Sequence, residues 1–316
     1  MDSFEFESGR VLENVEVEYR TYGTPKYDDD GNLTNAVLFF STFRDNYSFL
    51  RNSHEYLKNN KNFNAEFYFI LITSLGSPKS CSPSTTGLRH NFPHYTFKDI
   101  INFKRQFLND KFKIKRILGL IGEGLGGFEI LTWACEYPDD MEFIFLLNTS
   151  YKNSGYRYII SRCIENIMDI TDDYYSDVYS ISHSKMLIAI NTLIFAHSSS
   201  KKVFSNMENE ELEYLLDEFI DVGLFGDIHD FKFYNECFLY YNLEDKLSNI
   251  KARSLFIGNN RNYFDYTLDM LPLKELIKDS IVLTHDFDAD SYHFEDKYYR
   301  YFGEEVVRFL NQFDDN

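Results

Sequence analysis

The sequence contains few residues of the types that build disulfide frameworks and metal centres. Its 316 residues include four cysteines that lie far apart and form no C-x-x-C pair, namely Cys81, Cys135, Cys163 and Cys237. A disulfide-rich secreted domain is therefore excluded, and the thiols are expected to be reduced. Eight histidines show no H-E-x-x-H or comparable spacing, and Pro93 separates His90 from His94. The sequence thus indicates no metal site.

Long apolar runs and positive charge are also scarce. The longest mainly apolar run, residues 186–196, is far shorter than the roughly 20 residues that a membrane-spanning helix needs. The first seven residues, MDSFEFE, lack the basic and apolar regions of a signal peptide. There are 32 Lys and Arg residues against 50 Asp and Glu, a formal net charge of −18, which disfavours nucleic acid and anionic membranes as partners. We therefore expect a soluble, cytoplasmic protein that binds neither.

The chain is rich in apolar residues that can form a core. Hydrophobic residues make up 44% of it and aromatic residues 18%, which is not the composition of a disordered chain. Four apolar runs lack alternation: residues 36–40, 67–72, 117–121 and 143–147. Such runs are typical of parallel strands buried on both faces. Helical patterns at 97–108 and 126–136 lie between them. We therefore predict an α/β fold with a mostly parallel, doubly wound sheet.

The pattern changes in the second half of the chain. Residues 154–247 carry helical periods with few strand candidates, and strand patterns return after them. We predict one α/β core, residues 1–153 and 248–316, interrupted by a helical insertion at 154–247. Near the amino terminus, the strict alternation of residues 15–19 predicts a hairpin strand with one face in water.

The segment LGLIGEGLGGFE at 118–129 joins a buried strand to a helix through a glycine-rich turn. Gly122, Gly124 and Gly127 satisfy the G-x-G-x-x-G spacing of a dinucleotide-binding turn. However, several strands precede the turn and no ribose-binding acid follows at the expected strand end, so nicotinamide binding is the weaker alternative. The segment also fits the nucleophile elbow G-x-S-x-G, in which small residues flank a strained turn. Gly122 and Gly126 then fill the flanks, and Gly124 stands at the nucleophile position.

Motifs along nearly the whole chain are similar to those of one family. Residues 4–23, FEFESGRVLENVEVEYRTYG, follow a pattern F-x-L-E-S-G-x-x-L-x-x-V-x-V-x-Y-x-T-Y-G. TSLGS at 73–77, TG at 86–87 and FPHYTFKD at 92–99 are similar to its N-x-L-G-S, T-G and F-P-x-x-T-x-x-D elements, and 122–138 contains its elbow, L-x-W and Y-P. The chain therefore resembles the homoserine O-acetyltransferase family, acyltransferases of methionine biosynthesis. The resemblance implies an α/β-hydrolase fold with an inserted helical lid, and dimerisation through that lid.

The resemblance also implies a serine that is acylated by acyl-CoA, a histidine base and an aspartate that orients the base. The serine position is Gly124, which has no side chain to acylate. The aspartate position is Arg261, and the histidine position is Asp290. Asp265 and His293 stand near these positions in the sequence and are candidates for relocated groups.

Two further observations also indicate that the family's functional groups are missing from this sequence. Moving the nucleophile to Glu123 would place Ile121 and Leu125 on flanks that must be small. The family's A-R-x-I-x-x-x-T-Y segment most nearly matches residues 189–197, which puts Ile190 where an arginine is thought to hold the substrate carboxylate. An aliphatic side chain cannot form that ion pair. Four functional positions are therefore altered together, by different residue types.

Positive charge does gather in one segment, at Lys98, Lys104, Arg105, Lys111, Lys113, Lys115 and Arg116. A phosphate-binding strip is one interpretation, and the solvated face of an amphipathic helix is the favoured one. Acyl-CoA is a polyanion, so a chain with a net charge of −18 is poorly suited to bind it.

The sequence thus predicts a homoserine O-acetyltransferase-like pseudoenzyme that acts through binding. A small-molecule ligand is expected under the lid, and no cofactor is expected. The lid is expected to form a homodimer or a dimer with an active paralogue. The alternative is an active homoserine O-acyltransferase, which transfers the acyl group of acyl-CoA to L-homoserine with relocated groups such as His293.

Overall fold

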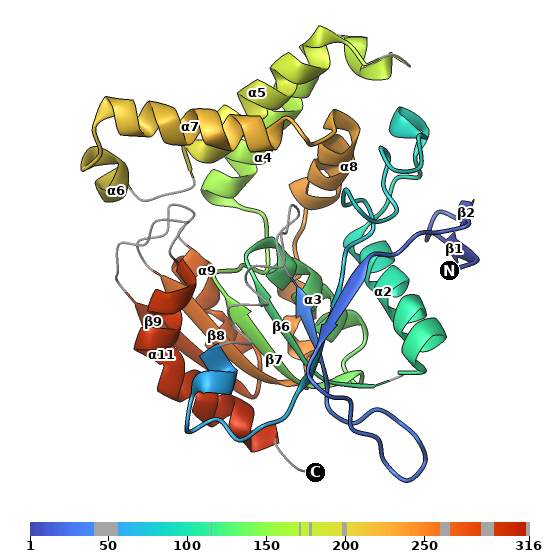
Figure 1. Ribbon diagram of the computed structural model, residues 1–316, viewed down its shortest axis with the longest axis vertical. Helices are drawn as coiled ribbons and strands as arrows, with labels where there is room; N and C mark the ends of the chain where they lie inside the picture. The colour runs from blue at the N-terminus through green and yellow to red at the C-terminus, as the bar shows by residue number, and fades with distance from the viewer. Residues whose placement is uncertain are drawn as a thin grey trace.

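A seven-stranded sheet of order β3-β5-β4-β6-β7-β8-β9 forms the centre of the chain (Figure 1). The computed structural model describes residues 1–40, 56–114, 116–170, 172–176, 179–197, 201–259, 266–285 and 294–313, and for 266–267 and 294–301 only the backbone. The strands are β3 (Tyr19–Tyr22), β4 (Ala36–Phe40), β5 (Tyr68–Ile72), β6 (Ile117–Glu123), β7 (Met141–Leu147), β8 (Arg253–Asn259) and β9 (Ser280–His285). All neighbours pair in parallel except β3, which is antiparallel to β5. The predicted, mostly parallel sheet is confirmed.

The sheet has an apolar core on each face, which explains why its strands are apolar throughout. In β4, Leu38 and Phe40 pack in one core with residues of α2 (Phe97–Phe112) and α3 (Leu125–Glu136). Val37 and Phe39 point to the other core, with residues of α11 (Phe294–Leu310). Alternate side chains of one strand therefore enter different cores, and none of β4 is left exposed.

A helical lid connects β7 to β8 and lies beyond the carboxyl ends of the strands (Figure 1). Its helices are α4 (Gly155–Met168), α5 (Ile181–Phe195), α6 (Lys201–Ser205), α7 (Asn209–Gly223) and α8 (Ile228–Leu239). The first half of α8 packs in an apolar cluster of the lid with Ile160 and Leu187. Tyr234 and Phe238, from its second half, pack in the main core instead. Helix α8 therefore joins the lid to the sheet.

Short elements complete the described chain. They are the 3₁₀ turns η1 (Arg89–Asn91), η2 (Asp172–Tyr175), η3 (Glu244–Asn249) and η4 (Asn311–Phe313), the helices α9 (Tyr266–Met270) and α10 (Leu273–Leu276), and a hairpin of β1 (Ser3–Glu5) with β2 (Val11–Glu13). None of the helices in these described ranges is both long and apolar enough to cross a membrane.

The strand predicted at residues 15–19 is wrong, because β3 begins only at Tyr19. Asn14 has a φ of 56°, a left-handed conformation that ends β2. The Val15 N–H then donates to the Met1 carbonyl at 2.9 Å, so the segment extends the amino-terminal hairpin irregularly before it reaches the sheet. Alternation alone could not show where the chain changes from one sheet to the other.

The predicted solvated face of α2 is also wrong at one position. Lys104 is 2% exposed, and its Nζ lies 2.8 Å from the carboxylate of Glu129 in α3. The Nζ also lies 4.1 Å from the centre of the Phe40 ring, a cation–π distance. The Ser74 hydroxyl donates to Glu129 at 2.7 Å. Burial lowers the pKa of Lys104, although Glu129 opposes this shift.

Other cations of the same segment are neutralised at the surface. Arg105 pairs with Asp140 at 2.7 Å, Lys98 with Glu7 at 3.1 Å and Arg116 with Glu142 at 3.4 Å. These pairs give no support to a phosphate-binding strip.

Lys104→Met should lower the free energy of unfolding by about 3–5 kcal/mol, because it leaves the Glu129 carboxylate buried without its cation. The double variant Lys104→Met/Glu129→Gln should recover most of this loss, since no buried charge remains. Urea denaturation measures both. Arg308→Ala is the control: it breaks an exposed pair with Glu305 and should cost no more than about 1 kcal/mol. A Lys104→Met loss no larger than that of the control would contradict the assignment.

Candidate functional site

One residue forms the turn between β6 and α3. Gly124 has φ 52° and ψ −118°, a conformation that side-chain-bearing residues adopt only under strain. Its N–H donates to the Leu147 carbonyl at 3.0 Å. Its carbonyl accepts from the Thr149 hydroxyl at 2.9 Å and from the Gly127 N–H at 3.1 Å. The strand–turn–helix geometry of a nucleophile elbow is therefore present, with glycine at its apex.

The packing around this turn leaves little room for a side chain at Gly122, which precedes the apex by two residues. A Cβ added to Gly122 would lie 2.7 Å from Ile130 Cδ1 and 3.1 Å from Phe40 Cβ. Glu123 belongs to the strand and not to the turn, because it pairs with Leu147 in the register of β6 and β7. The structure thus gives no support to a nucleophile shifted to Glu123.

The residues that follow β7 connect the elbow to the end of β8. Asn148 has a φ of 40° and is 2% exposed. Its N–H donates to the Ile257 carbonyl at 2.9 Å, and its Oδ1 accepts from the Asn259 N–H at 3.0 Å. Asn148 therefore orients the last residue of β8. Sequence reasoning missed this residue, although a polar run after a buried strand could have indicated it.

Of the four altered functional positions, the structure describes two, Gly124 and Ile190. Arg261 and Asp265, on the connection from β8 to α9, lie outside the described residues. Asp290 and His293, on the connection from β9 to α11, also lie outside them. Ile190 is described: it is fully buried in the apolar cluster of the lid. That side chain packs within the lid.

An ion pair that the sequence did not reveal links the lid to the core. Arg157 of α4, 5% exposed at its side chain, pairs with Asp269 of α9. Asp269 also accepts from the Ser150 hydroxyl at 2.9 Å, just beyond the end of β7. The three residues join three segments at the carboxyl side of the sheet. The ion pair holds α9, which follows the predicted acid position in the sequence, against the lid.

A second polar contact joins α8 to the segment before η1. Asp230 is fully buried and accepts from the Ser84 N–H at 2.9 Å and the Ser84 hydroxyl at 2.6 Å. Burial raises the pKa of Asp230 to about 6, although the bonds from Ser84 act in the opposite direction. The carboxylate therefore carries an unfavourable charge at neutral pH.

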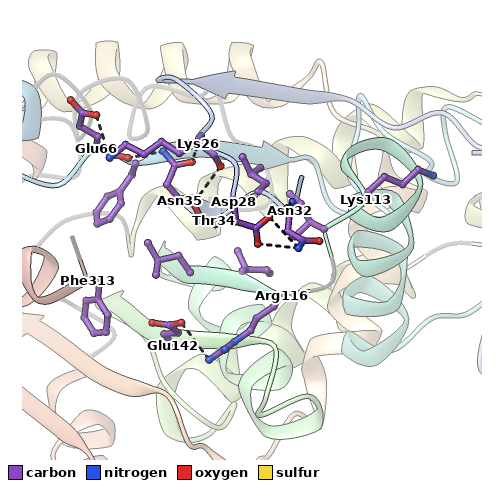
Figure 2. Close-up of a pocket in the computed structure, with 15 residues that line it drawn as sticks. Lys26, Asp28, Asn32, Thr34, Asn35, Glu66, Lys113, Arg116, Glu142 and Phe313 are labelled. Atoms are coloured by element: carbon purple, nitrogen blue, oxygen red, sulfur yellow. Dashed lines mark hydrogen bonds and ion pairs between the residues drawn. The ribbon is translucent and has the colours of Figure 1, made fainter. Parts of the chain in front are cut away.

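A cavity of about 500 Å³ lies at the amino ends of strands β4, β5, β6 and β7, at the opposite end of the sheet from the elbow (Figure 2). Four of the six charged side chains that line it form ion pairs with one another. Lys26 pairs with Glu66 at 3.4 Å, and Arg116 pairs with Glu142 at the same distance. Asp28 accepts the Asn32 N–H at 2.7 Å within its own turn. We assign this cavity no role in the elbow site.

No protein-family model matches the chain. The chain is 35% identical over 312 residues to a protein named probable acyltransferase from Methanothermobacter thermautotrophicus, covering 98% of this chain and 96% of that one. It is 30% identical over 165 residues to a homoserine O-acetyltransferase from Deferribacter desulfuricans, covering only 47% of this chain and 43% of that one.

Among solved structures, an acetylester hydrolase from Corynebacterium glutamicum aligns with a TM-score of 0.80 and 17% identity, over 98% of this chain and 93% of that one. A homoserine O-acetyltransferase from Staphylococcus aureus aligns with a TM-score of 0.76 and 16% identity over the same shares. At such identities the structural likeness establishes the fold.

Asp230→Asn should change the free energy of unfolding more favourably at pH 7.5 than at pH 4. The pKa of Asp230 rises from an ordinary 3.8 to about 6 on folding, so its favourable contribution is complete below pH 4 and is lost as the pH rises through 6. The asparagine keeps both contacts without the charge. The difference in free energy of unfolding between variant and wild type should therefore change by about 3 kcal/mol across this range. Urea denaturation at both pH values measures it.

The control for this prediction is Asp28→Asn. Hydrogen bonds from Asn32 lower the pKa of Asp28, so the contribution of this exposed carboxylate is present at neutral pH and is lost as the pH falls. Its pH trend should have the opposite sign. Equal trends in the two variants would show that burial of Asp230 is not the cause.

Proposed function

The chain belongs to the homoserine O-acetyltransferase-like family of α/β-hydrolase-fold proteins, and from this premise we propose that it binds a small-molecule ligand beneath its lid without catalysing acyl transfer. The observation that carries the proposal is glycine at the apex of a turn that keeps its nucleophile-elbow geometry. Covalent acyl transfer needs a nucleophilic side chain at that point. Gly124 supplies none, while its hydrogen bonds to Leu147 and Thr149 preserve the shape of the turn.

Two other features support binding without transfer. The lid position matched to the family's carboxylate-binding arginine is Ile190, which is buried in the apolar cluster of the lid. The net charge of −18 also disfavours a polyanionic donor such as acyl-CoA. A ligand of this site is therefore expected to be small and not strongly anionic.

The lid also carries the surface that we propose for dimerisation. Its exposed apolar side chains include Tyr158 and Ile159 of α4, Ile188 of α5, Tyr214 and Val222 of α7, and Phe225. Phe225 is 92% exposed, which is unfavourable for a large aromatic ring in water. We expect a second copy, or an active paralogue of the same fold, to cover these side chains.

The purified protein should release no thiol from acetyl-CoA in a manner that depends on homoserine. Gly124→Ser and Gly124→Ala form a matched pair, because both impose a side chain on the same positive φ and only one adds a hydroxyl. A fluorophosphonate probe should not label the wild type or Gly124→Ala. Robust homoserine-dependent thiol release by the wild type would overturn the proposal. If His293→Ala then abolished that turnover, relocated catalytic groups would be the explanation.

Phe225→Asp should shift the protein from dimer to monomer in size-exclusion chromatography with light scattering, because it places a charge on the proposed apolar contact. Tyr27→Asp is the control: Tyr27 is 62% exposed and lines the turn between β3 and β4, away from the lid. It should leave the mass unchanged. A monomeric wild type would contradict the proposed homodimer.

A further inference from the structure

A buried histidine in the lid has acceptors on both sides of its ring. His229 is 2% exposed. Its Nδ1 lies 3.0 Å from the Asp227 carboxylate, and its Nε2 lies 3.0 Å from the Tyr174 backbone carbonyl. A carbonyl can only accept a hydrogen bond. Asp227 is ionised, because bonds from His229 hold the pKa of that carboxyl below its usual value although burial alone would raise it. Both ring nitrogens must therefore donate, and only the imidazolium form can do so.

The groups around His229 come from every element that packs on it. Asp227 is the N-cap of α8, and Asp230 lies in its first turn. Tyr174 and Asp173 belong to η2, His183 to α5 and His90 to η1. The rings of His183 and His90 are centred 5.8 Å and 6.4 Å from that of His229. The Tyr174 ring is centred 4.8 Å from the His229 ring. The ammonium of Lys232 lies 5.5 Å from the centre of the Tyr174 ring.

The neighbouring histidine does not share the charge. His183 accepts the Ser180 N–H at its Nδ1, at 2.9 Å, so that nitrogen carries no proton. Burial and then the positive charge of His229 lower the pKa of His183. The cluster therefore holds its positive charge on His229, opposite the carboxylate of Asp227.

We propose that the His229 imidazolium is a proton-operated latch that holds η2 against the start of α8 within the lid. Loss of one proton to solvent leaves a ring nitrogen with a lone pair facing an acceptor, which breaks one of the two bonds and brings two lone pairs together. The link between η2 and α8 then opens as the pH rises. The latch shares with the proposed function only the premise that the lid covers the ligand. The latch itself can be tested without any ligand.

His197 provides an internal comparison. It is also buried and has two partners, with Nδ1 2.6 Å from the Leu193 carbonyl and Nε2 2.9 Å from the Tyr156 hydroxyl. Because the hydroxyl can donate to Nε2, a neutral ring with one N–H satisfies both contacts. The two histidines are thus both buried but have different proton requirements.

Nitrogen-15 NMR of the full chain with labelled histidine tests the protonation directly. His229→Gln and His197→Gln assign the two signals. Near neutral pH, His229 should show two protonated nitrogens and His197 one. A His229 ring with a single N–H at that pH would overturn the proposal, and this measurement on the wild type does not depend on how the variants fold.

Hydrogen exchange tests the latch itself. Exchange of the amides in residues 172–176, corrected for the intrinsic rate, should rise by at least about tenfold as the ring loses its proton, since a charge-assisted bond stabilises by an amount of this order. Asp227→Asn keeps a helix-capping oxygen and removes the charge, so the rise should move to lower pH. His229→Gln should abolish the rise, whereas His197→Gln and Asp230→Asn should retain it. The same rise in His229→Gln would refute the latch and leave the proposed ligand binding untouched.

Discussion

The tight turn at Gly124 is the constraint on which the rest of the site depends. One residue reverses the chain between β6 and α3, and its backbone is held by Leu147 and Thr149 of the neighbouring strand and loop. In this conformation a side chain at the apex would point out of the turn under strain, which is how the fold presents a nucleophile. Glycine adopts the same angles without strain. The elbow can therefore keep its shape, and the helix behind it, after its reacting group is gone.

The lid is attached to this core by contacts of two kinds. Helix α8 belongs to the apolar cluster of the lid at one end and to the main core at the other, which is a non-directional and permanent attachment. Arg157 with Asp269 and Asp230 with Ser84 are directional contacts between polar groups of the lid and the core. Such contacts stabilise one arrangement only while their charge states hold.

The hydrophobic patterns predicted most of the sheet correctly, because a strand buried on both faces must be apolar along its length. The errors arose where one residue serves two elements. Lys104 lies in a basic segment that resembles a solvated face, yet it is buried because Glu129 and the Phe40 ring meet it across the core. Helix α8 lies within the predicted helical insertion but is buried on several sides, with His229, Asp230 and Lys232 among its buried residues, so its period is not that of an amphipathic helix.

The sequence by itself determined the fold class, the family resemblance and the absence of a nucleophile at residue 124, since each depends on residue types in a local order. The tertiary structure alone decided which charges are buried and paired. Asn148 with Asn259, Arg157 with Asp269 and Asp230 with Ser84 join residues separated by 111, 112 and 146 positions. Local spacing contains no information about such contacts, because chain reversals at the turns and the lid bring these residues together only when the sheet has formed.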